Sequence, residues 1–265
     1  MTNLAFIGAG KMAEALIAKL NKENNILAAD INASRLQYLK KRYKIKVTKD
    51  NNEAFKSGDI VILAVKPQQM GEVLEELRPT TNDQRPTTLI ISIAAGITLA
   101  YLQKRLPGFA VIRAMPNNPC LIGMGVTAMV KGKNVSSKQV KQAKAIFSKV
   151  GEVYYVVEHL MSAVTGLSGS GPAFVYQTID ALALGGREAG LPKNLAEKFA
   201  LQTVIGAAMT VKTTGKTPAE LTAMVASPGG TTIEGLKRLE KYELPRALKE
   251  AVTAAAKKSA SLSRI

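Results

Sequence analysis

Residues 7–12 read Ile7-Gly8-Ala9-Gly10-Lys11-Met12, and Ala13 completes the pattern G-x-G-x-x-A. A short apolar run at residues 4–7 precedes the glycines. Apolar residues at the spacing of one helix face follow them: Met12, Leu16 and Leu20. A glycine pattern between a strand and a helix is typical of the loop that holds the pyrophosphate of a dinucleotide. The first glycine allows a tight turn, the second lets a phosphate approach the backbone, and the helix start offers free N–H groups.

Strand-like and helix-like segments alternate over the first half of the chain. We expect strands at residues 4–7, 26–29, 60–65, 89–91 and 110–114. We expect helices at residues 12–20, 34–43 (with Ser34 as the cap), 70–77 and 98–106 (with Thr98 as the cap). Such alternation predicts a parallel sheet with helices on both faces, the doubly wound α/β arrangement of a Rossmann domain.

The pattern changes after about residue 158, where strand-like runs give way to Ala-rich helical segments. Helices are expected from Pro172 to about residue 190, from 195 to 212, after the capping box Thr217-Pro218-Ala219-Glu220, and from about Pro245. The sequence therefore predicts a dinucleotide-binding domain at residues 1–158 and an all-helical domain at residues 159–265.

The expected cofactor residues lie at the carboxyl ends of strands, where doubly wound folds bind ligands. Besides residues 7–12 they are Ala64, Val65, Lys66 and Pro67, and Ile93, Ala94 and Ala95. Asp30 lies 22 residues after Gly8, at the position that reads the ribose. An acid there normally accepts from the 2′-hydroxyl and repels a 2′-phosphate, which favours NAD. Arg35 and Lys40 could instead neutralise a 2′-phosphate, so both cofactors stay open.

Composition excludes several classes of function. No segment approaches the ~18 consecutive apolar residues of a membrane span, and Gly8 lies too near the first residue for a signal peptide to precede it. A single Cys120 rules out an intrachain disulfide, so we expect a soluble cytoplasmic protein. The net charge of +16 comes from dispersed side chains, which fits attraction of small anions better than nucleic-acid binding. No cluster of His and Cys suggests a metal site, and the lone His159 and Cys120 are expected to be structural.

Two small-residue segments stand out in the second half. One is Thr165-Gly166-Leu167-Ser168-Gly169-Ser170-Gly171-Pro172, and the other is Ala226-Ser227-Pro228-Gly229-Gly230-Thr231-Thr232-Ile233-Glu234. Each is expected to be a loop that runs into a helix and exposes backbone N–H groups. The second has two adjacent glycines and flanking hydroxyls, which favours a cradle for a carboxylate over an ordinary turn.

With these segments, the chain resembles the pyrroline-5-carboxylate reductase family over essentially its whole length. The matching segments are residues 6–12, 64–67, 92–96, 113–117, 169–173 and 227–233, in the family's order. The last segment is the family's signature. The resemblance implies reduction of the C=N bond of 1-pyrroline-5-carboxylate to L-proline, the final step of proline synthesis. It also implies that the helical domain forms an intertwined homodimer, with higher rings of dimers in some members.

The resemblance also implies residue roles. Thr232 is expected to hydrogen-bond the ring nitrogen as the catalytic residue. The substrate carboxylate would be held by Ser227, Gly229, Gly230 and Thr231. Asn51 matches an asparagine near the adenosine ribose. Family members commonly use NADPH, and Asp30 keeps NADH possible.

Two alternatives remain at this level. A β-hydroxyacid dehydrogenase shares the two-domain layout, but it needs a lysine on the helix after its second glycine loop, and Gly169-Ser170-Gly171-Pro172 is followed by apolar residues. A non-catalytic dinucleotide-sensing module would need Gly8 and Gly10 but no carboxylate cradle.

Overall fold

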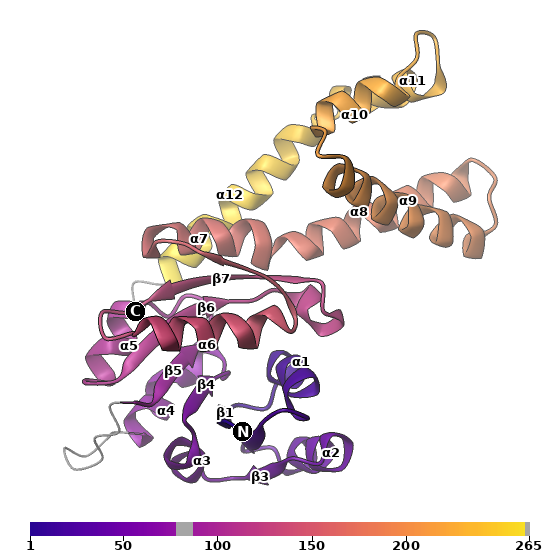
Figure 1. Cartoon of the computed structure of the whole chain (residues 1–265). Helices are drawn as coiled ribbons and strands as arrows, with labels where there is room; N and C mark the ends of the chain where they lie inside the picture. The colour runs from indigo at the N-terminus through magenta and orange to yellow at the C-terminus, as the bar shows by residue number, and fades with distance from the viewer. Residues whose placement is uncertain (78–86, 263–265) are drawn as a thin grey trace. The chain divides into compact units, whose positions relative to one another are not determined.

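A computed structural model describes residues 1–77 and 87–262 (Figure 1). The chain divides into two compact units. The first comprises Met1–Ser170 together with the end of the chain from Ala254, and the second is Gly171–Thr253. Each unit is described by itself below. Among the helices of the described residues, none is long and apolar enough to cross a membrane.

The first unit contains an eight-stranded sheet with the order β3-β2-β1-β4-β5-β6-β7-β8. Its strands are β1 Asn3–Ile7, β2 Asn25–Ala29, β3 Lys46–Thr48, β4 Ile60–Leu63, β5 Leu89–Ser92, β6 Ala110–Met115, β7 Gly125–Lys131 and β8 Gly151–Tyr155. The strands from β3 to β6 are all parallel and run in the order 3-2-1-4-5-6, which is that of a dinucleotide-binding fold. The predicted doubly wound sheet is confirmed, with β3 as the one of these six strands that the sequence did not predict.

Helices cover both faces of this sheet. The helices of the first unit are α1 Lys11–Leu20, α2 Ala33–Tyr43, α3 Asn51–Ser57, α4 Met70–Glu76, α5 Leu99–Arg105, α6 Ser137–Ser148 and α7 Met161–Val164. Buried residues of α1, α2 and α6 form one core with Leu4 and Phe6 of β1, and α3, α4 and α5 form the other with Ala5 and Ile7. Successive residues of a strand point to opposite faces, so a strand buried on both faces is apolar throughout.

The edge beyond β6 differs from the expected all-parallel sheet. Strand β7 runs antiparallel to β6, and β8 pairs parallel with β7. The strands β3, β7 and β8 and the helices α3 and α6 were not predicted. β3 has only three residues, and β8 is mostly exposed, so neither shows a continuous apolar run. A strand that is exposed at an edge has a weak sequence signal.

Of the caps predicted for α5 and α2, the first is confirmed and the second is wrong. Thr98 caps α5 by accepting from the backbone N–H of Tyr101, as expected. The expectation of Ser34 as the cap of α2 is wrong. Asn32 takes that position, with its side chain accepting from the N–H of Arg35, so the helix begins at Ala33. Asparagine is at least as good a cap as serine, and here it lies two residues earlier.

The helical part comprises α8 Gly171–Glu188, α9 Lys193–Thr214, α10 Pro218–Val225, α11 Thr231–Lys241 and α12 Leu244–Leu262. The capping box at Thr217 and Glu220 is formed, and Gly215 ends α9 at a φ of 66°. The side chains buried in α8 and α9 are small, namely Ala183, Ala196 and Ala200. The large apolar side chains of these helices, such as Tyr176 and Phe199, are exposed.

Candidate functional site

The first glycine of the loop after β1 is required by the backbone. Gly8 has a φ of 93°, a conformation that side chains strongly disfavour. A Cβ at this position would lie only 2.7 Å from the carbonyl carbon of Ala64, at the end of β4. The N–H of Gly8 donates to Ala29 O at 2.9 Å. The tight turn after β1 is therefore enclosed by β2 and β4, and no other residue fits there.

The second glycine is different, because the protein itself leaves room around it. Gly10 is exposed, and a Cβ built on it would meet nothing within 4 Å. It is the N-cap of α1, and no side chain caps this helix start. The free N–H groups and the positive end of the helix dipole suit a phosphate group. Ala13, the small residue at the third position, is fully buried against the sheet. The loop thus fits a dinucleotide pyrophosphate that approaches Gly10.

The parallel register gathers the other expected cofactor residues at the same edge of the sheet. The N–H of Ala64 donates to Ile7 O at 2.7 Å, and that of Ile93 donates to Leu63 O at 3.0 Å. The segments 64–67 and 93–95 therefore leave the sheet next to the glycine loop. Lys66 is exposed. Asn51 begins α3, which follows β3, and its Nδ2 donates to Glu76 Oε2 at 2.8 Å.

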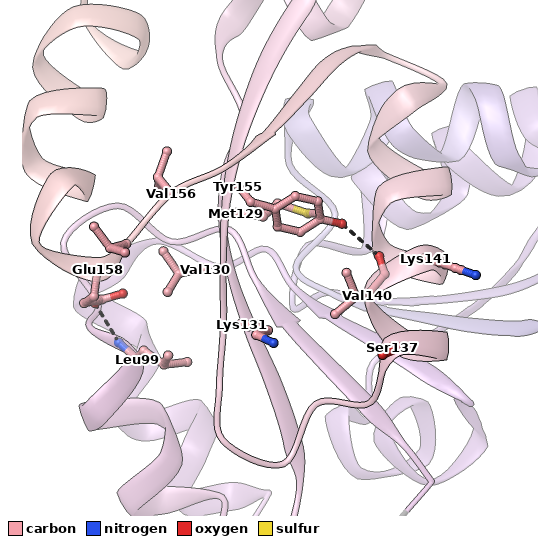
Figure 2. A pocket seen from close by; sticks show the side chains of 11 residues that line it. Leu99, Met129, Val130, Lys131, Ser137, Val140, Lys141, Tyr155, Val156 and Glu158 are labelled. Atoms are coloured by element: carbon pink, nitrogen blue, oxygen red, sulfur yellow. Dashed lines mark hydrogen bonds between the residues drawn. The ribbon is translucent and has the colours of Figure 1, made fainter.

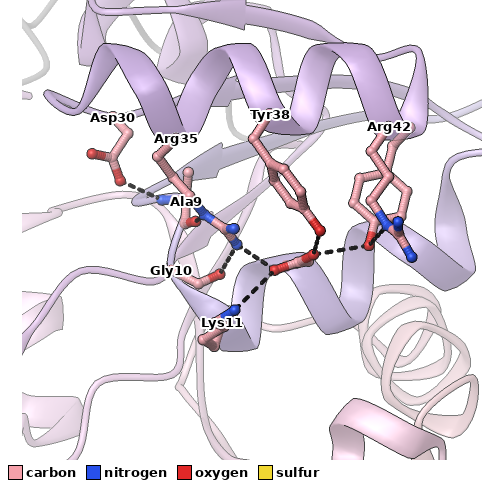
Figure 3. A network of polar contacts seen from close by, with 9 residues as sticks. Ala9, Gly10, Lys11, Asp30, Arg35, Tyr38 and Arg42 are labelled. Atoms are coloured by element: carbon pink, nitrogen blue, oxygen red, sulfur yellow. Dashed lines mark hydrogen bonds and ion pairs between the residues drawn. The ribbon is translucent and has the colours of Figure 1, made fainter.

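Asp30 follows β2 and faces the glycine loop (Figure 3). Its Oδ2 accepts from the N–H of Ala9 at 2.7 Å, and its Oδ1 accepts from the N–H of Asn32 at 2.8 Å. Each carboxylate oxygen therefore already has a backbone donor, which the sequence did not reveal.

Arg35 of α2 contacts the same loop. Its Nε donates to Ala9 O at 2.6 Å, and its Nη2 donates to Glu14 Oε2 at 2.6 Å. Glu14 Oε1 accepts from the hydroxyls of Tyr38 and Tyr43, both at 3.0 Å. Burial opposes ionisation of Glu14, but the hydrogen bonds from Arg35, Tyr43 and Tyr38 outweigh it and lower the pKa of this carboxyl.

The role of Glu14, Tyr38 and Tyr43 was missed from the sequence. A signal was present, because Arg35, Tyr38 and Arg42 recur at the three- and four-residue spacing of one helix face. The partner that this face would contact, Glu14, could be identified only once α1 and α2 were placed side by side.

The expected carboxylate cradle belongs to the second unit and connects α10 to α11. The N–H of Gly230 donates to Ser227 O at 3.0 Å, and Gly229 has a φ of 70°. Proline followed by a glycine with positive φ is the pattern of a type II turn. A Cβ at Gly230 would lie 2.5 Å from Ser227 Oγ, so the second glycine makes room for this hydroxyl.

The turn leads directly into the N-terminus of α11. Gly230 is its N-cap, and no side chain caps the helix. Thr231 and Thr232 form its first turn, with Thr232 half-buried. The backbone N–H groups and the hydroxyl of Ser227 together offer hydrogen-bond donors that a carboxylate could accept.

The segment 165–172 is helical, which differs from the expected loop. Thr165–Gly169 forms a π-helix between α7 and α8. Asn117, after β6, holds this segment, because its Nδ2 donates to Ser168 O at 3.2 Å and its Oδ1 accepts from the N–H of Val126 at 2.9 Å. Short π-helical segments between α-helices are frequent at functional sites.

A hollow of about 680 Å³ lies elsewhere in the first unit, at the β7–β8 edge of the sheet (Figure 2). Its wall is mainly apolar and includes Met129, Val140 and Tyr155. Glu158 at its rim accepts from the N–H of Leu99 at 3.0 Å and pairs with the buried Arg113 at 2.6 Å. None of the expected cofactor or substrate residues lines this hollow.

The lone histidine and cysteine lie apart from both loops in sequence. His159 is exposed, and Cys120 is fully buried, with a thiol pKa that burial raises. Within residues 1–77 and 87–262 no group of three His, Cys, Asp or Glu side chains could hold a metal ion.

Comparison with known proteins identifies both halves of the chain. Residues 158–262 match the family model for pyrroline-5-carboxylate reductase dimerisation, and residues 3–96 match that for NADP oxidoreductase, coenzyme F420-dependent. The pyrroline-5-carboxylate reductase of Synechocystis sp. is 47% identical over 98% of both chains.

Two solved structures are similar over nearly their whole length. The Coxiella burnetii pyrroline-5-carboxylate reductase has a TM-score of 0.89 at 34% identity, covering 99% of this chain and 98% of that one. The Plasmodium falciparum pyrroline carboxylate reductase, solved with NADP bound, has a TM-score of 0.88 at 30% identity with the same coverage.

Proposed function

The chain belongs to the pyrroline-5-carboxylate reductase family, and on that premise we propose that it reduces 1-pyrroline-5-carboxylate to L-proline with NADPH. The imine carbon gains a hydride and the ring nitrogen gains a proton, which leaves NADP⁺. The observation that carries the proposal is the turn of residues 227–230 that opens α11. It adds a carboxylate cradle to a chain that already has a dinucleotide loop.

The cofactor would be held at the carboxyl edge of the sheet in the first unit. The pyrophosphate would approach Gly10 and the N–H groups of Lys11 and Met12, while Ile7, Gly8 and Ala9 shape the turn. The remaining contacts would come from Asn51, residues 64–67 and residues 93–95, and Asp30 would serve cofactor binding by holding the glycine loop. When bound, the reduced nicotinamide supplies the hydride. The protein's own contribution is chiefly to position the two reactants.

The substrate carboxylate would be bound by Ser227, Gly229, Gly230 and Thr231. A carboxylate at a helix N-terminus is stabilised by the dipole and by unpaired N–H groups. Thr232, one residue further along α11, would donate a hydrogen bond to the ring nitrogen and help to deliver its proton. A neutral hydroxyl suits this role, because hydride addition turns the imine nitrogen into a more basic amine nitrogen, which then needs only a nearby hydrogen-bond donor.

We propose residues 1–158 as the dinucleotide-binding domain and residues 159–265 as the helical domain for substrate binding and dimerisation. Support for a homodimer comes from the exposed apolar side chains of α8 and α9. Val175, Tyr176, Leu184 and Phe199 are 44–55% exposed in the single chain. Apolar patches of this kind usually mark an interface. We also propose that the dimers assemble into a higher ring and that the protein is cytoplasmic. Its partners would be small molecules, and it would bind neither nucleic acid nor a membrane.

Oxidation of NADPH in the presence of 1-pyrroline-5-carboxylate tests the activity directly. We expect turnover with this imine and none with a panel of β-hydroxyacids and NADP⁺. Turnover of a hydroxyacid alone would assign the chain to dehydrogenases, and cofactor binding without turnover of any substrate would indicate a sensing role.

A further inference from the structure

Ala9, the residue between the two loop glycines, has both of its backbone polar groups bound by side chains. It is fully buried. Its N–H donates to Asp30 Oδ2 at 2.7 Å, and its carbonyl accepts from Arg35 Nε at 2.6 Å. Hydrogen bonds with one charged partner are shorter and stronger than neutral ones. Two opposite charges, both from the segment after β2, therefore fix the position of one residue of the cofactor loop.

Arg35 is itself held in place. Its Nη2 donates to Gly10 O at 3.3 Å and pairs with Glu14 Oε2 at 2.6 Å, and its side chain is only 19% exposed. Glu14 is anchored in turn by the hydroxyls of Tyr38 and Tyr43 (Figure 3). The guanidinium is thus bound to the loop and to α1, and it does not extend into solvent as a flexible cation would.

The carboxylate of Asp30 is likewise held by hydrogen bonds on both oxygens. Its second oxygen accepts from the N–H of Asn32 at 2.8 Å, immediately before α2. An acid at this position usually points toward the ribose, where it binds the 2′-hydroxyl and repels a 2′-phosphate. Here both oxygens have backbone donors, and one of these donors belongs to the loop.

We propose that Asp30 and Arg35 are positioning residues that hold the Ala9 peptide of the cofactor loop, and that Asp30 does not select between NADPH and NADH. The inference rests on the proposed use of a dinucleotide, but not on the identity of the imine substrate. Loss of either side chain should shift the loop that both cofactors share. Both cofactors should then bind more weakly by a similar factor.

Direct titration of the full-length protein with NADPH and with NADH, followed by cofactor fluorescence, tests the proposal without any turnover. In Asp30→Asn, which preserves size but replaces one oxygen by a donor, we expect both dissociation constants to rise roughly tenfold, or about 1.4 kcal/mol. Their ratio should stay within about twofold of the wild-type ratio. Arg35→Met keeps the apolar stem and removes the donors, and it should behave in the same way.

The matched control is Lys41→Met, which removes an exposed cation further along α2 and should change neither constant. Thermal unfolding in the absence of cofactor shows that each variant is folded. In the double variant Asp30→Asn/Arg35→Met the two losses should not add, because both side chains act on the same peptide.

Two results would overturn the proposal. If Asp30→Asn improved binding of NADPH relative to NADH tenfold, the carboxylate would be the selecting group. If both constants stayed at the wild-type values in a folded variant, the contact with Ala9 would have no bearing on cofactor binding. Failure of the proposed reductase activity would appear separately, as wild-type protein that binds NADPH but does not turn over the imine.

Discussion

The loop of residues 8–12 and the loop of residues 227–232 are both rich in small residues, and each leads into the N-terminus of a helix. They differ in which residues hold them in place. Around the first loop, β4 approaches Gly8 and side chains from beyond β2 bind Ala9. In the second loop both glycines are explained within the loop itself, by the turn at Gly229 and by the Ser227 hydroxyl next to Gly230. Contacts from neighbouring strands hold the first loop in its shape before a ligand binds. The second loop is held mainly by contacts within itself, so we expect its shape to adjust more easily to a ligand.

The largest effect that separates the two loops is expected at Gly8. Gly8→Ala would force a side chain into a φ of 93° and place its Cβ 2.7 Å from the backbone of Ala64. Backbone strain and overpacking together should lower the free energy of unfolding by roughly 2–6 kcal/mol in urea denaturation. The control Gly10→Ala has room for its Cβ, so it should keep wild-type stability and weaken NADPH binding. Equal stability of both variants would contradict the enclosure of Gly8.

A smaller effect is expected at Gly230. Gly230→Ala would push the Ser227 hydroxyl from its place, but the loop is largely exposed and can give way. We expect the free energy of unfolding to change by less than about 1 kcal/mol. The KM for 1-pyrroline-5-carboxylate should rise roughly tenfold while the KM for NADPH stays constant. An increase confined to the KM for NADPH would show that this loop serves the other ligand.

Ionic strength should affect the ligands of the two loops unequally. The net charge of +16 attracts both anions, and the dinucleotide carries more negative charge than the imine. Raising the salt concentration should lower kcat/KM for NADPH about two- to fivefold and kcat/KM for the imine by less. A flat response for both would rule out electrostatic steering.

The smallest effect concerns acid. Because the pKa of Glu14 is lowered from 4.5 in the folded protein, its contribution to stability is present above that value. This contribution is lost as the pH falls through the lower, folded-state pKa. The difference in urea midpoint between wild type and Glu14→Gln should therefore be constant above pH 4.5 and shrink as the pH falls below it. Residues 227–232 carry no ionisable side chain, so the second loop gives no such signal. A difference that stayed constant below pH 4.5 as well would contradict the network around Arg35.

The sequence predicts the part of the fold that long apolar patterns determine. β1, β4 and β5 are buried on both faces, and the two glycine loops have distinctive spacings. β8 was not predicted, because its exposed residues carry no clear periodicity. The antiparallel direction of β7 depends on the turn through η2, Asn118–Ile122, which local patterns do not reveal.

Residue placement within the site shows the same division. The spacing of Asp30 from Gly8 identifies its position at the end of a strand, as observed. Which way its carboxylate points depends on the donors around it, and these come from Ala9 and Asn32. The contact between Arg35 and Glu14 joins α1 and α2 through two residues that lie 21 positions apart in the chain, so only the packed structure could show it.

The first loop is proposed to bind the cofactor and the second to serve the substrate chemistry, and one variant tests this division most directly. Thr232→Ala should lower kcat/KM for 1-pyrroline-5-carboxylate by about 10²- to 10⁴-fold, whereas Thr232→Ser, which keeps the hydroxyl, should lose far less. The dissociation constant of NADPH, measured on the same protein by fluorescence, should stay within about twofold of wild type. Wild-type turnover in Thr232→Ala, or loss of NADPH binding in a folded variant, would contradict the division.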